Sequence, residues 1–334
     1  MVESLSVGDD DTGEVQEVLS SQRLEFAPVL LHVGLHKTGS TWVQKRLFKD
    51  SKRGFTDKTG EPRDNIIKRL VMHDPLFFDA PATAAHYAPT IEAANASGLT
   101  LVLSHERLSG HPSSGGIDRC IIAERLKATF PDARILVVIR EQRALIASMY
   151  ALHIRLGGVE SLRRYLSTPE PGAGRKHSFT FEMYEFDRLI AFYRSLFGES
   201  RVLILPLELL AREPQDFADR IGSFCGHPSV PLGPTKRLNV RHPRLLQLTQ
   251  RPLNMLFYHN ELSPGAIVHI PNFTRRYAEF AKRFGRFSPD FLERKLQKRQ
   301  RIEIEALVGD RFAMSNRRTQ EMTGLPLAEL GYPV

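Results

Sequence analysis

A strand, a loop and the start of a helix are predicted by the segment Val29-Leu-Leu-His-Val-Gly-Leu-His-Lys-Thr-Gly-Ser-Thr-Trp42. The same segment indicates an anion-binding site. Its first residues, Val29–Val33, form a short apolar run that is typical of a buried β-strand. Gly34 ends this run, and a stretch compatible with a helix follows from Ser40 to Leu47. A strand, a loop and a helix in this order point backbone N–H groups and the positive end of the helix at one spot. The segment therefore predicts a site for a phosphate or sulfate, with Lys37 supplying a full positive charge.

The order of residues in this loop differs from that of a Walker A loop. A Walker A loop reads G-x-x-x-x-G-K-[ST], with the lysine after the second glycine. Here Lys37 precedes the second glycine, Gly39, in the order G-x-x-K-T-G-S-T. A lysine this early in the loop can reach the bridging oxygen of a phosphosulfate, where charge develops on the leaving group. Ser40 and Thr41 add hydroxyl donors. The alternative is a chance turn between a strand and a helix.

Residues 34–42 resemble the 5′-phosphosulfate loop of sulfotransferases that use 3′-phosphoadenosine 5′-phosphosulfate (PAPS), which is written around K-[ST]-G-[ST]-T-W. In that family the lysine contacts the phosphosulfate and the donors after it hold the 5′-phosphate, while the tryptophan packs at the adenine. The resemblance makes Lys37 both catalytic and nucleotide-binding, and it assigns the adenine to Trp42, for which a core aromatic is the alternative. His36 is expected to shape the loop. The donors after the lysine are Thr38, Gly39, Ser40 and Thr41.

A second motif of the same kind is Arg134-Ile-Leu-Val-Val-Ile-Arg140, followed by Glu-Gln-Arg-Ala-Leu-Ile-Ala-Ser148-Met-Tyr150. An apolar strand delivers Arg140 at its carboxyl end, where open α/β sheets bind ligands, and a guanidinium can donate two N–H bonds to one phosphate. The motif resembles the family's 3′-phosphate motif, a strand followed by R-[NED]-P-x-x-x-x-x-S-x-Y. Arg140 and Ser148 have its eight-residue offset. Gln142 replaces its proline, which leaves the start of the helix less fixed. For Arg140 alone, a surface salt bridge is the alternative.

Two further segments resemble the same family more weakly. Residues 201–210 resemble a strand that ends in Y-E-D-L, but Leu207 and Leu209 replace the tyrosine and the aspartate. The basic glycine loop of the cytosolic branch is not visible. Residues 236–241 are a candidate substitute for it, with a plain solvated loop as the alternative. The resemblance covers about residues 28–225.

The candidate bases follow the second apolar strand, in Leu103-Ser-His-Glu-Arg107. Sulfuryl transfer needs an in-line nucleophile, stabilisation of the leaving 5′-phosphate and usually a base for the acceptor proton. Cytosolic members of the family place a histidine here, which would match His105, and several carbohydrate-acting members use a glutamate, which Glu106 could supply. We favour Glu106, with Arg107 as its partner. His36 is a third option. The plain alternative is a strand-end polar group that binds loop backbone.

The apolar runs predict an α/β fold with a central parallel sheet flanked by helices, and the resemblance implies the P-loop NTPase-like fold of sulfotransferases. Each run is followed by a pattern with helical spacing. The four runs are Val29–Val33, Thr100–Leu103, Ile135–Ile139 and Arg201–Leu205. Residues 50–98 fit helices broken by loops, Pro214–Phe224 fits an amphipathic helix, and residues 226–242 fit a loop. Because no linker marks a boundary, we expect one domain over residues 28–334, with a basic helical part over about 273–314.

The charge of the chain is unevenly distributed. The formal net charge is +8, yet residues 1–27 are acidic and predict a disordered leader. The basic excess therefore lies on the remaining residues, where it attracts anions without selecting among them. No secretory signal is visible and no apolar run approaches the ~20 residues that cross a bilayer. Cys120 and Cys225 fit a reducing cytoplasm more simply than one disulfide, so we expect a cytoplasmic protein.

Three classes of function compete. The first is a sulfotransferase that transfers a sulfuryl group from PAPS to a hydroxyl or amine and releases 3′-phosphoadenosine 5′-phosphate (PAP). A P-loop kinase or NTPase would need an acidic residue at a strand end to hold Mg²⁺. The strands end instead in Ser104-His105, Arg140 and Pro206, so we expect no metal.

The third class is a non-enzymatic binder of nucleic acid or another polyanion. It rests on the basic residues of the C-terminal part, which fit a solvent-facing amphipathic helix or a docking face for an anionic acceptor. They are Arg275, Arg276, Lys282, Arg283, Arg286, Arg294, Lys295, Lys298, Arg299 and Arg301. A binder has no need for two phosphate motifs, so we expect no nucleic-acid partner.

The acceptor is the least specified part of the prediction. Residues 311–318 and 330–333 resemble the ending of bacterial sulfotransferases assigned to glycans and other cell-envelope acceptors. A small-molecule or glycan acceptor with a saccharide hydroxyl is therefore our lead. A phenolic, sterol-like or lipid-linked hydroxyl is the second choice. Contact with a membrane surface and the oligomeric state stay open.

Overall fold

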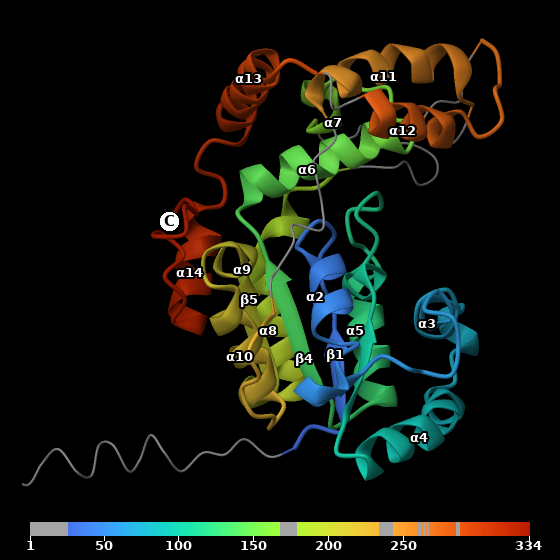
Figure 1. Ribbon diagram of the computed structural model, residues 1–334, viewed down its shortest axis with the longest axis vertical. Helices are drawn as coiled ribbons and strands as arrows, with labels where there is room; N and C mark the ends of the chain where they lie inside the picture. Colours follow the sequence, from blue (N-terminus) through green and yellow to red (C-terminus); the bar gives the residue numbers. More distant parts are fainter. Residues whose placement is uncertain are drawn as a thin grey trace, which may run out of the picture.

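The structure is a computed structural model that describes residues 26–167, 179–233, 243–259, 262, 265, 267–284 and 288–334. These residues form a central sheet of five parallel strands in the order β2-β3-β1-β4-β5 (Figure 1). The strands are β1 (Val29–His32), β2 (Phe55–Thr56), β3 (Thr100–Ser104), β4 (Arg134–Ile139) and β5 (Val202–Pro206). The predicted α/β fold with a central parallel sheet is therefore confirmed. The four predicted strands are found to within one residue at each end, and the two-residue strand β2 was not predicted.

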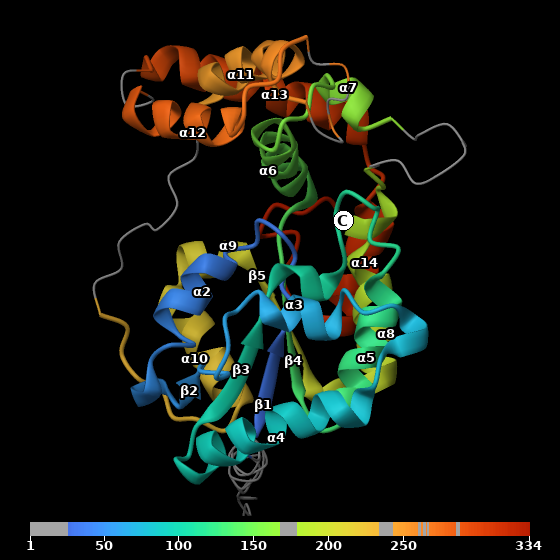
Figure 2. The same cartoon turned by 90° about the vertical axis from the view of Figure 1, so that its right-hand side faces the viewer.

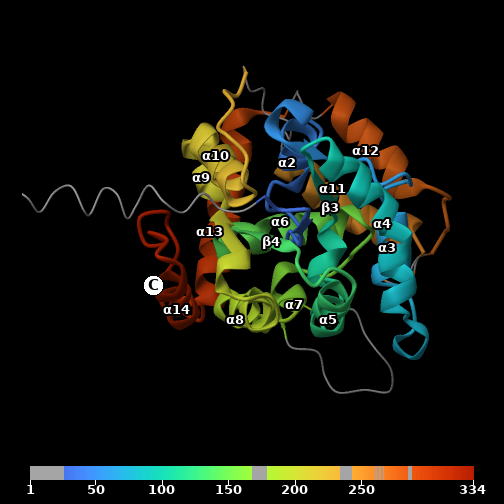
Figure 3. The ribbon, with the colours of Figure 1, turned by 90° about the horizontal axis from the view of Figure 1, so that it is seen from below.

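Alternate residues of each strand face opposite sides of the sheet, because the side-chain period of a strand is two. Leu31 of β1 belongs to one apolar core, and Leu30 belongs to a second core on the other face. The first core includes residues of α4 (Ala80–Ala96), α5 (Arg119–Thr129) and α8 (Phe186–Phe197). The second includes residues of α2 (Ser40–Arg46) and α10 (Pro214–Phe224), next to α9 (Leu207–Arg212). Figure 3 shows these two groups of helices on opposite sides of the strands.

Another group of helices forms a layer beyond the carboxyl ends of the strands (Figure 2). This layer consists of α6 (Gln142–Arg155), α7 (Leu162–Tyr165), α11 (Arg244–Phe257), α12 (Phe273–Phe284) and α13 (Asp290–Val308). The chain then returns to the level of the sheet as α14 (Ala313–Thr323), which packs against α8. The predicted basic helical part thus consists of α12 and α13 and the beginning of α14.

Shorter elements complete the described part of the chain. The broken helices predicted between residues 50 and 98 are α3 (Asn65–Leu70) and α4, with the 3₁₀ turns η1 (Ser51–Arg53) and η2 (Pro75–Phe77). Three further 3₁₀ turns are η3 (Glu106–Ser109), η4 (Glu182–Tyr184) and η5 (Glu199–Arg201). The candidate basic loop at 236–241, Arg286 and residues 1–25 of the predicted leader lie outside the described residues. The single domain over 28–334 stays a prediction.

The strand order places a switch point at the centre of the sheet. From β1 the chain passes to β2 and β3 on one side, and it then crosses to β4 and β5 on the other. The helix after β1, α2, and the helix before β4, α5, lie against opposite faces. Open α/β sheets bind ligands outside the carboxyl ends of the strands at such a point. The loops after β1 and β4 are therefore the expected place for a binding site.

The cysteines and the apolar character of the helices bear on two further predictions, about a disulfide and about a membrane span. Both cysteines are free, with Cys120 exposed on α5 and Cys225 buried after α10. None of the described helices combines the length and the apolar character that crossing a membrane requires.

Candidate functional site

The two phosphate motifs of the sequence meet at the carboxyl ends of β1 and β4. Lys37 has a left-handed backbone with φ of 67°, which is uncommon for a residue other than glycine. Its carbonyl oxygen accepts a hydrogen bond of 3.0 Å from Nη1 of Arg140. The two residues are 103 positions apart in the chain, so this contact depends on the fold and joins the lysine of one motif to the arginine of the other.

Two glycines allow the loop to pass close to its neighbours. Gly39 precedes α2 with φ of 86°, and a Cβ atom there would lie 2.6 Å from Cδ1 of Leu207. A Cβ atom on Gly34 would lie 2.6 Å from Nε2 of His32. Both distances are shorter than real Cβ contacts, so the loop needs glycine at both positions.

The hydroxyl groups of the loop have different environments. Oγ1 of Thr38 donates a hydrogen bond of 2.6 Å to the carbonyl of Leu35, so this buried hydroxyl holds the loop in shape. Ser40 is only 4% exposed, and its Oγ has no hydrogen-bond partner among the described residues. A buried hydroxyl without a partner carries a desolvation cost that a bound ligand would offset. Thr41 is half-buried on the first turn of α2.

Positive charge is concentrated around Lys37. Burial lowers the pKa of Lys37 to about 8, helped by the nearby charges of Arg155 and Arg140. Arg155 is half-buried on the last turn of α6, and burial lowers its pKa as well. Neither Lys37 Nζ nor the guanidinium of Arg155 forms an ion pair within the described part of the chain. Three cations that repel one another at the end of a sheet form an environment suited to a multiply charged anion.

Arg155 was not predicted from the sequence. The available signal was its spacing from Ser148, because residues seven apart lie on the same face of a helix. Ser148 is half-buried on α6, and no hydrogen bond of its hydroxyl is found in the described ranges. The role of Ser148 stays a prediction.

His36 and His32 are both neutral at physiological pH. Burial lowers the pKa of each imidazole to about 4. Nδ1 of His36 is buried and has no hydrogen-bond partner in the described residues. Nδ1 of His32 lies 2.7 Å from Oγ of Ser104, which also accepts a hydrogen bond of 2.9 Å from Gln44. This network joins the ends of β1 and β3 to α2.

Glu106 forms an ion pair with a residue that was not predicted. Its Oε2 lies 2.5 Å from Nη2 of Arg63, and Nε of Arg63 donates to the carbonyl of Ser104 at 2.9 Å. The predicted partner, Arg107, pairs instead with Asp118 at 3.2 Å, so that part of the prediction is wrong. Burial alone would raise the pKa of Glu106, but the charge and hydrogen bond of Arg63, together with a backbone hydrogen bond, lower the pKa on balance. Glu106 is therefore an ionised carboxylate at neutral pH.

His105 is engaged on both sides of its ring. Nδ1 accepts a hydrogen bond of 3.1 Å from the backbone N–H of Arg107, and Nε2 lies 3.6 Å from Asp64. Burial and the charge of Arg63 lower its pKa. Because the lone pair of Nδ1 is occupied, the neutral ring carries its proton on Nε2. His105 thus caps η3, and the lone pair of its Nδ1 is already engaged by the backbone.

Trp42 lies at the border between the second core and solvent. Its ring is half-buried and meets Phe217 edge to face at a centroid distance of 6.4 Å. Gln142 does not leave the start of α6 loose, contrary to the expectation from the missing proline. The carboxylate of Glu141 accepts hydrogen bonds from the backbone N–H groups of Arg143 and Ala144, at 2.9 and 2.7 Å. The helix is therefore capped by a side chain, which replaces what a proline would contribute.

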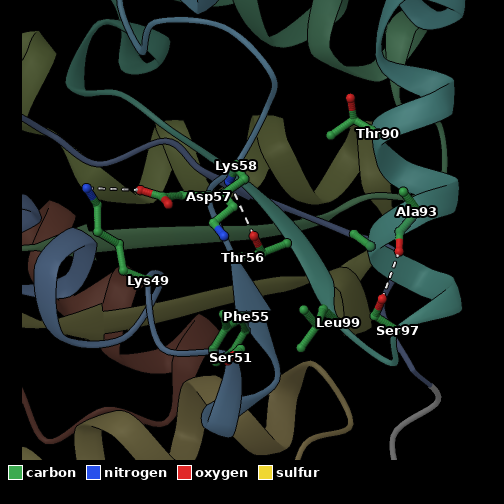
Figure 4. A pocket seen from close by; sticks show the side chains of 11 residues that line it. Lys49, Ser51, Phe55, Thr56, Asp57, Lys58, Thr90, Ala93, Ser97 and Leu99 are labelled. Carbon is green, nitrogen blue, oxygen red and sulfur yellow. Dashed lines mark hydrogen bonds and ion pairs between the residues drawn. The ribbon is translucent and has the colours of Figure 1, made fainter.

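A separate hollow lies away from these residues, between the edge strand β2 and α4 (Figure 4). Its lining includes Lys49 and Asp57, which form an ion pair at 3.8 Å, and none of the predicted site residues. Within the described ranges, no group of three or more His, Cys, Asp or Glu side chains is arranged to hold a metal ion.

Comparisons with known proteins give similarities of fold. No protein-family model and no curated protein matches this chain. One solved structure with a similar fold is a sulfotransferase from Alicyclobacillus acidocaldarius, with 16% identity, a TM-score of 0.43, and coverage of 75% of this chain and 98% of that chain. Another is a sulfotransferase domain from the curacin biosynthetic pathway, with 13% identity, a TM-score of 0.39, and coverage of 84% and 96%. At such identities the similarity concerns the fold alone.

Proposed function

We propose that this chain is a sulfotransferase that transfers a sulfuryl group from PAPS to an acceptor hydroxyl. The observation that carries the proposal is the hydrogen bond from Arg140 to the carbonyl of Lys37. It holds together two loops that each resemble a phosphate-binding motif of one family. Both loops lie at the switch point of the sheet, where α/β folds bind nucleotides.

The residues present suit a donor with phosphate groups at two positions. Lys37 and the unpartnered hydroxyl of Ser40 would hold the phosphosulfate, and Arg140 would bind the 3′-phosphate. Arg155 adds a cation that the resemblance did not include. Because Lys37 and Arg155 form no ion pair in the described part of the chain, their charges are available to an anionic ligand.

The donor supplies an activated sulfuryl group, and the protein supplies charge and position. The acceptor oxygen forms a bond to sulfur while the bond between sulfur and the 5′-phosphate oxygen breaks. The electron pair of that bond stays on the phosphate of PAP, where Lys37 would stabilise it. The acceptor proton passes to a base.

We assign the base to Glu106, which is ionised and lies close enough to Lys37 to affect the pKa of the lysine. The ion pair with Arg63 makes this carboxylate a weaker base but fixes its position. His36 is the competitor, because its imidazole is neutral and its Nδ1 has no hydrogen-bond partner in the residues described.

For the acceptor we propose a small molecule or glycan with a saccharide hydroxyl. Several polar and charged side chains that can hydrogen-bond hydroxyl groups lie around the end of β3, namely Arg63, Asp64, His105, Glu106 and Asp118. The exposed free thiol of Cys120 fits a reducing compartment such as the cytoplasm.

The test is calorimetric titration of the purified protein with PAP, and separately with ATP and Mg²⁺. We expect PAP to bind in the micromolar range or tighter and ATP–Mg²⁺ to bind at least about tenfold more weakly, which is about 1.4 kcal/mol. Preference for ATP–Mg²⁺ would favour a kinase or NTPase instead. Absence of binding by both would remove the donor proposal.

A further inference from the structure

We infer that residues 316–333 position the turn that carries Arg140, through a pair of buried amides and a tyrosine–glutamate hydrogen bond. The turn consists of Arg140, Glu141 and Gln142, between the end of β4 and the start of α6. The inference rests on the proposed function, because it gives a binding role to Arg140. Asn316, Tyr332 and Glu208 would then be positioning residues for the donor site.

The amide pair joins α14 to the first residue of α6. Nε2 of Gln142 donates to Oδ1 of Asn316 at 2.6 Å, and Nδ2 of Asn316 donates back to Oε1 of Gln142 at 3.1 Å. The second proton of Asn316 Nδ2 goes to the carbonyl of Pro333 at 2.7 Å. Nε2 of Gln142 also lies 3.4 Å from the carbonyl of Tyr184.

This pair is satisfied without water. Gln142 and Asn316 are both completely buried, and each amide has a partner for its oxygen and for its nitrogen. Removing one amide leaves the side-chain oxygen of its buried partner without a hydrogen bond, which costs about 1–3 kcal/mol. The pair therefore holds the start of α6 in one place, and residues 174 positions apart depend on each other.

A second connection reaches the same turn through Glu208 on α9. The hydroxyl of Tyr332 donates to Oε2 of Glu208 at 2.8 Å, and Oε1 of Glu208 accepts the backbone N–H of Glu141 at 3.2 Å. Tyr332 is 3% exposed. Burial and the charge of Glu208 raise the pKa of Tyr332 well above its ordinary value, so the hydroxyl remains a donor.

The two connections hold the residues that follow Arg140 by their side chains and backbone. The backbone N–H of Glu141 donates to the side chain of Glu208, and the carboxylate of Glu141 caps α6. The side chain of Arg140 is long, so a small rotation of its backbone moves the guanidinium by an ångström or more. A misplacement of about 1 Å can lower the rate about 10²-fold. The turn is thus a place where distant residues can change donor binding without touching the donor.

The first experiment needs no nucleotide. Asn316→Ala removes the amide that binds Gln142, and Thr319→Ala is the matched control. Thr319 is also fully buried on α14, but its hydroxyl binds only the carbonyl of Ser315. Hydrogen–deuterium exchange should be at least about tenfold faster for the peptide over residues 141–145 in Asn316→Ala than in Thr319→Ala. Equal exchange in the two variants would overturn the inference.

The second experiment measures the consequence for the donor. Asn316→Ala should weaken PAP about tenfold and adenosine 5′-phosphosulfate, which lacks the 3′-phosphate, less than twofold. A purely structural role would weaken both ligands alike, and that result would overturn the inference. If Asn316→Ala fails to fold, Tyr332→Phe keeps the buried ring and removes only the hydroxyl, with a smaller loss of PAP affinity expected. If the wild type binds neither ligand, the proposed function fails, while the exchange experiment still decides whether the turn is held.

Discussion

The two sides of the site differ in how their charges are partnered. At the end of β3 each charge has a counterpart, with Glu106 bound to Arg63 and Arg107 bound to Asp118. At the ends of β1 and α6, Lys37 and Arg155 have no carboxylate partner within the described residues. A half-buried cation without a counterion costs stability, because burial disfavours the charged form. Under the proposed function, the anionic donor would supply the missing counter-charge on the β1 side, whereas the charges on the β3 side already pair with each other.

The largest effect should come from removing the charge of Lys37. Lys37→Ala should lower turnover about 10²–10³-fold and PAP affinity much less, because the contact strengthens as charge develops on the leaving phosphate. Steady-state kinetics and PAP titration measure the two quantities. Lys45→Ala removes an exposed lysine on α2, the helix that follows the loop, and is the control that should change neither. Equal losses in turnover and affinity would show that Lys37 only binds.

On the β3 side we expect a substitution to affect the chemical step alone. Glu106→Gln should lower turnover about 10²-fold and leave PAP affinity unchanged, because a base contributes only to the chemical step. Asp57→Asn disturbs an ion pair with Lys49 away from the site and is the control. His36→Asn tests the competing base. A larger loss of turnover in His36→Asn than in Glu106→Gln would reassign the base to His36.

Arg140 should act on binding rather than on chemistry. Arg140→Ala should weaken PAP about 10–100-fold, as expected for a charge-assisted hydrogen bond, and adenosine 5′-phosphosulfate less than threefold. Calorimetry with both ligands measures the difference. Arg201→Ala removes an exposed guanidinium that pairs with Asp132 and should have no effect. If both ligands weaken alike, the 3′-phosphate is bound elsewhere.

The smallest effect is a dependence on pH near neutrality. The pKa of Lys37 is lowered to about 8, so the lysine is charged below that pH and loses its proton above it. The value of kcat/KM for the donor should therefore fall up to tenfold per pH unit above about pH 8. Lys37→Arg should remove this decline, because a guanidinium stays protonated. A profile that stays flat to pH 9.5 in the wild type would contradict the role of the lysine charge.

The sequence predicted the elements whose signals are local. Apolar runs identified β1, β3, β4 and β5, and the turn between β1 and α2 was predicted because all of its residues lie within one short segment. The two-residue strand β2 is too short to show alternation. The start of α6 was misjudged because the cap by the neighbouring Glu141 was overlooked, and because Asn316, which binds Gln142, lies 174 positions away.

Two site residues were missed for similar physical reasons. Arg63 is 43 positions from Glu106, and no local pattern connects an arginine to a distant carboxylate. Arg155 lies on the same face of α6 as Ser148, but only the path of α6 across the strand ends brings its charge near Lys37. Pairings of this kind depend on tertiary structure and therefore have no signature in a single sequence.

The two cysteines offer a practical route to the acceptor. Cys225 is fully buried and burial raises the pKa of its thiol to about 12, so it should not react with alkylating dyes. Cys120 is exposed on α5, and α5 packs against η3, which begins at Glu106. A maleimide fluorophore would therefore mark the unmodified protein at one position on the β3 side. Collections of sugars and phenols could then be screened optically for binding, with no need to observe turnover.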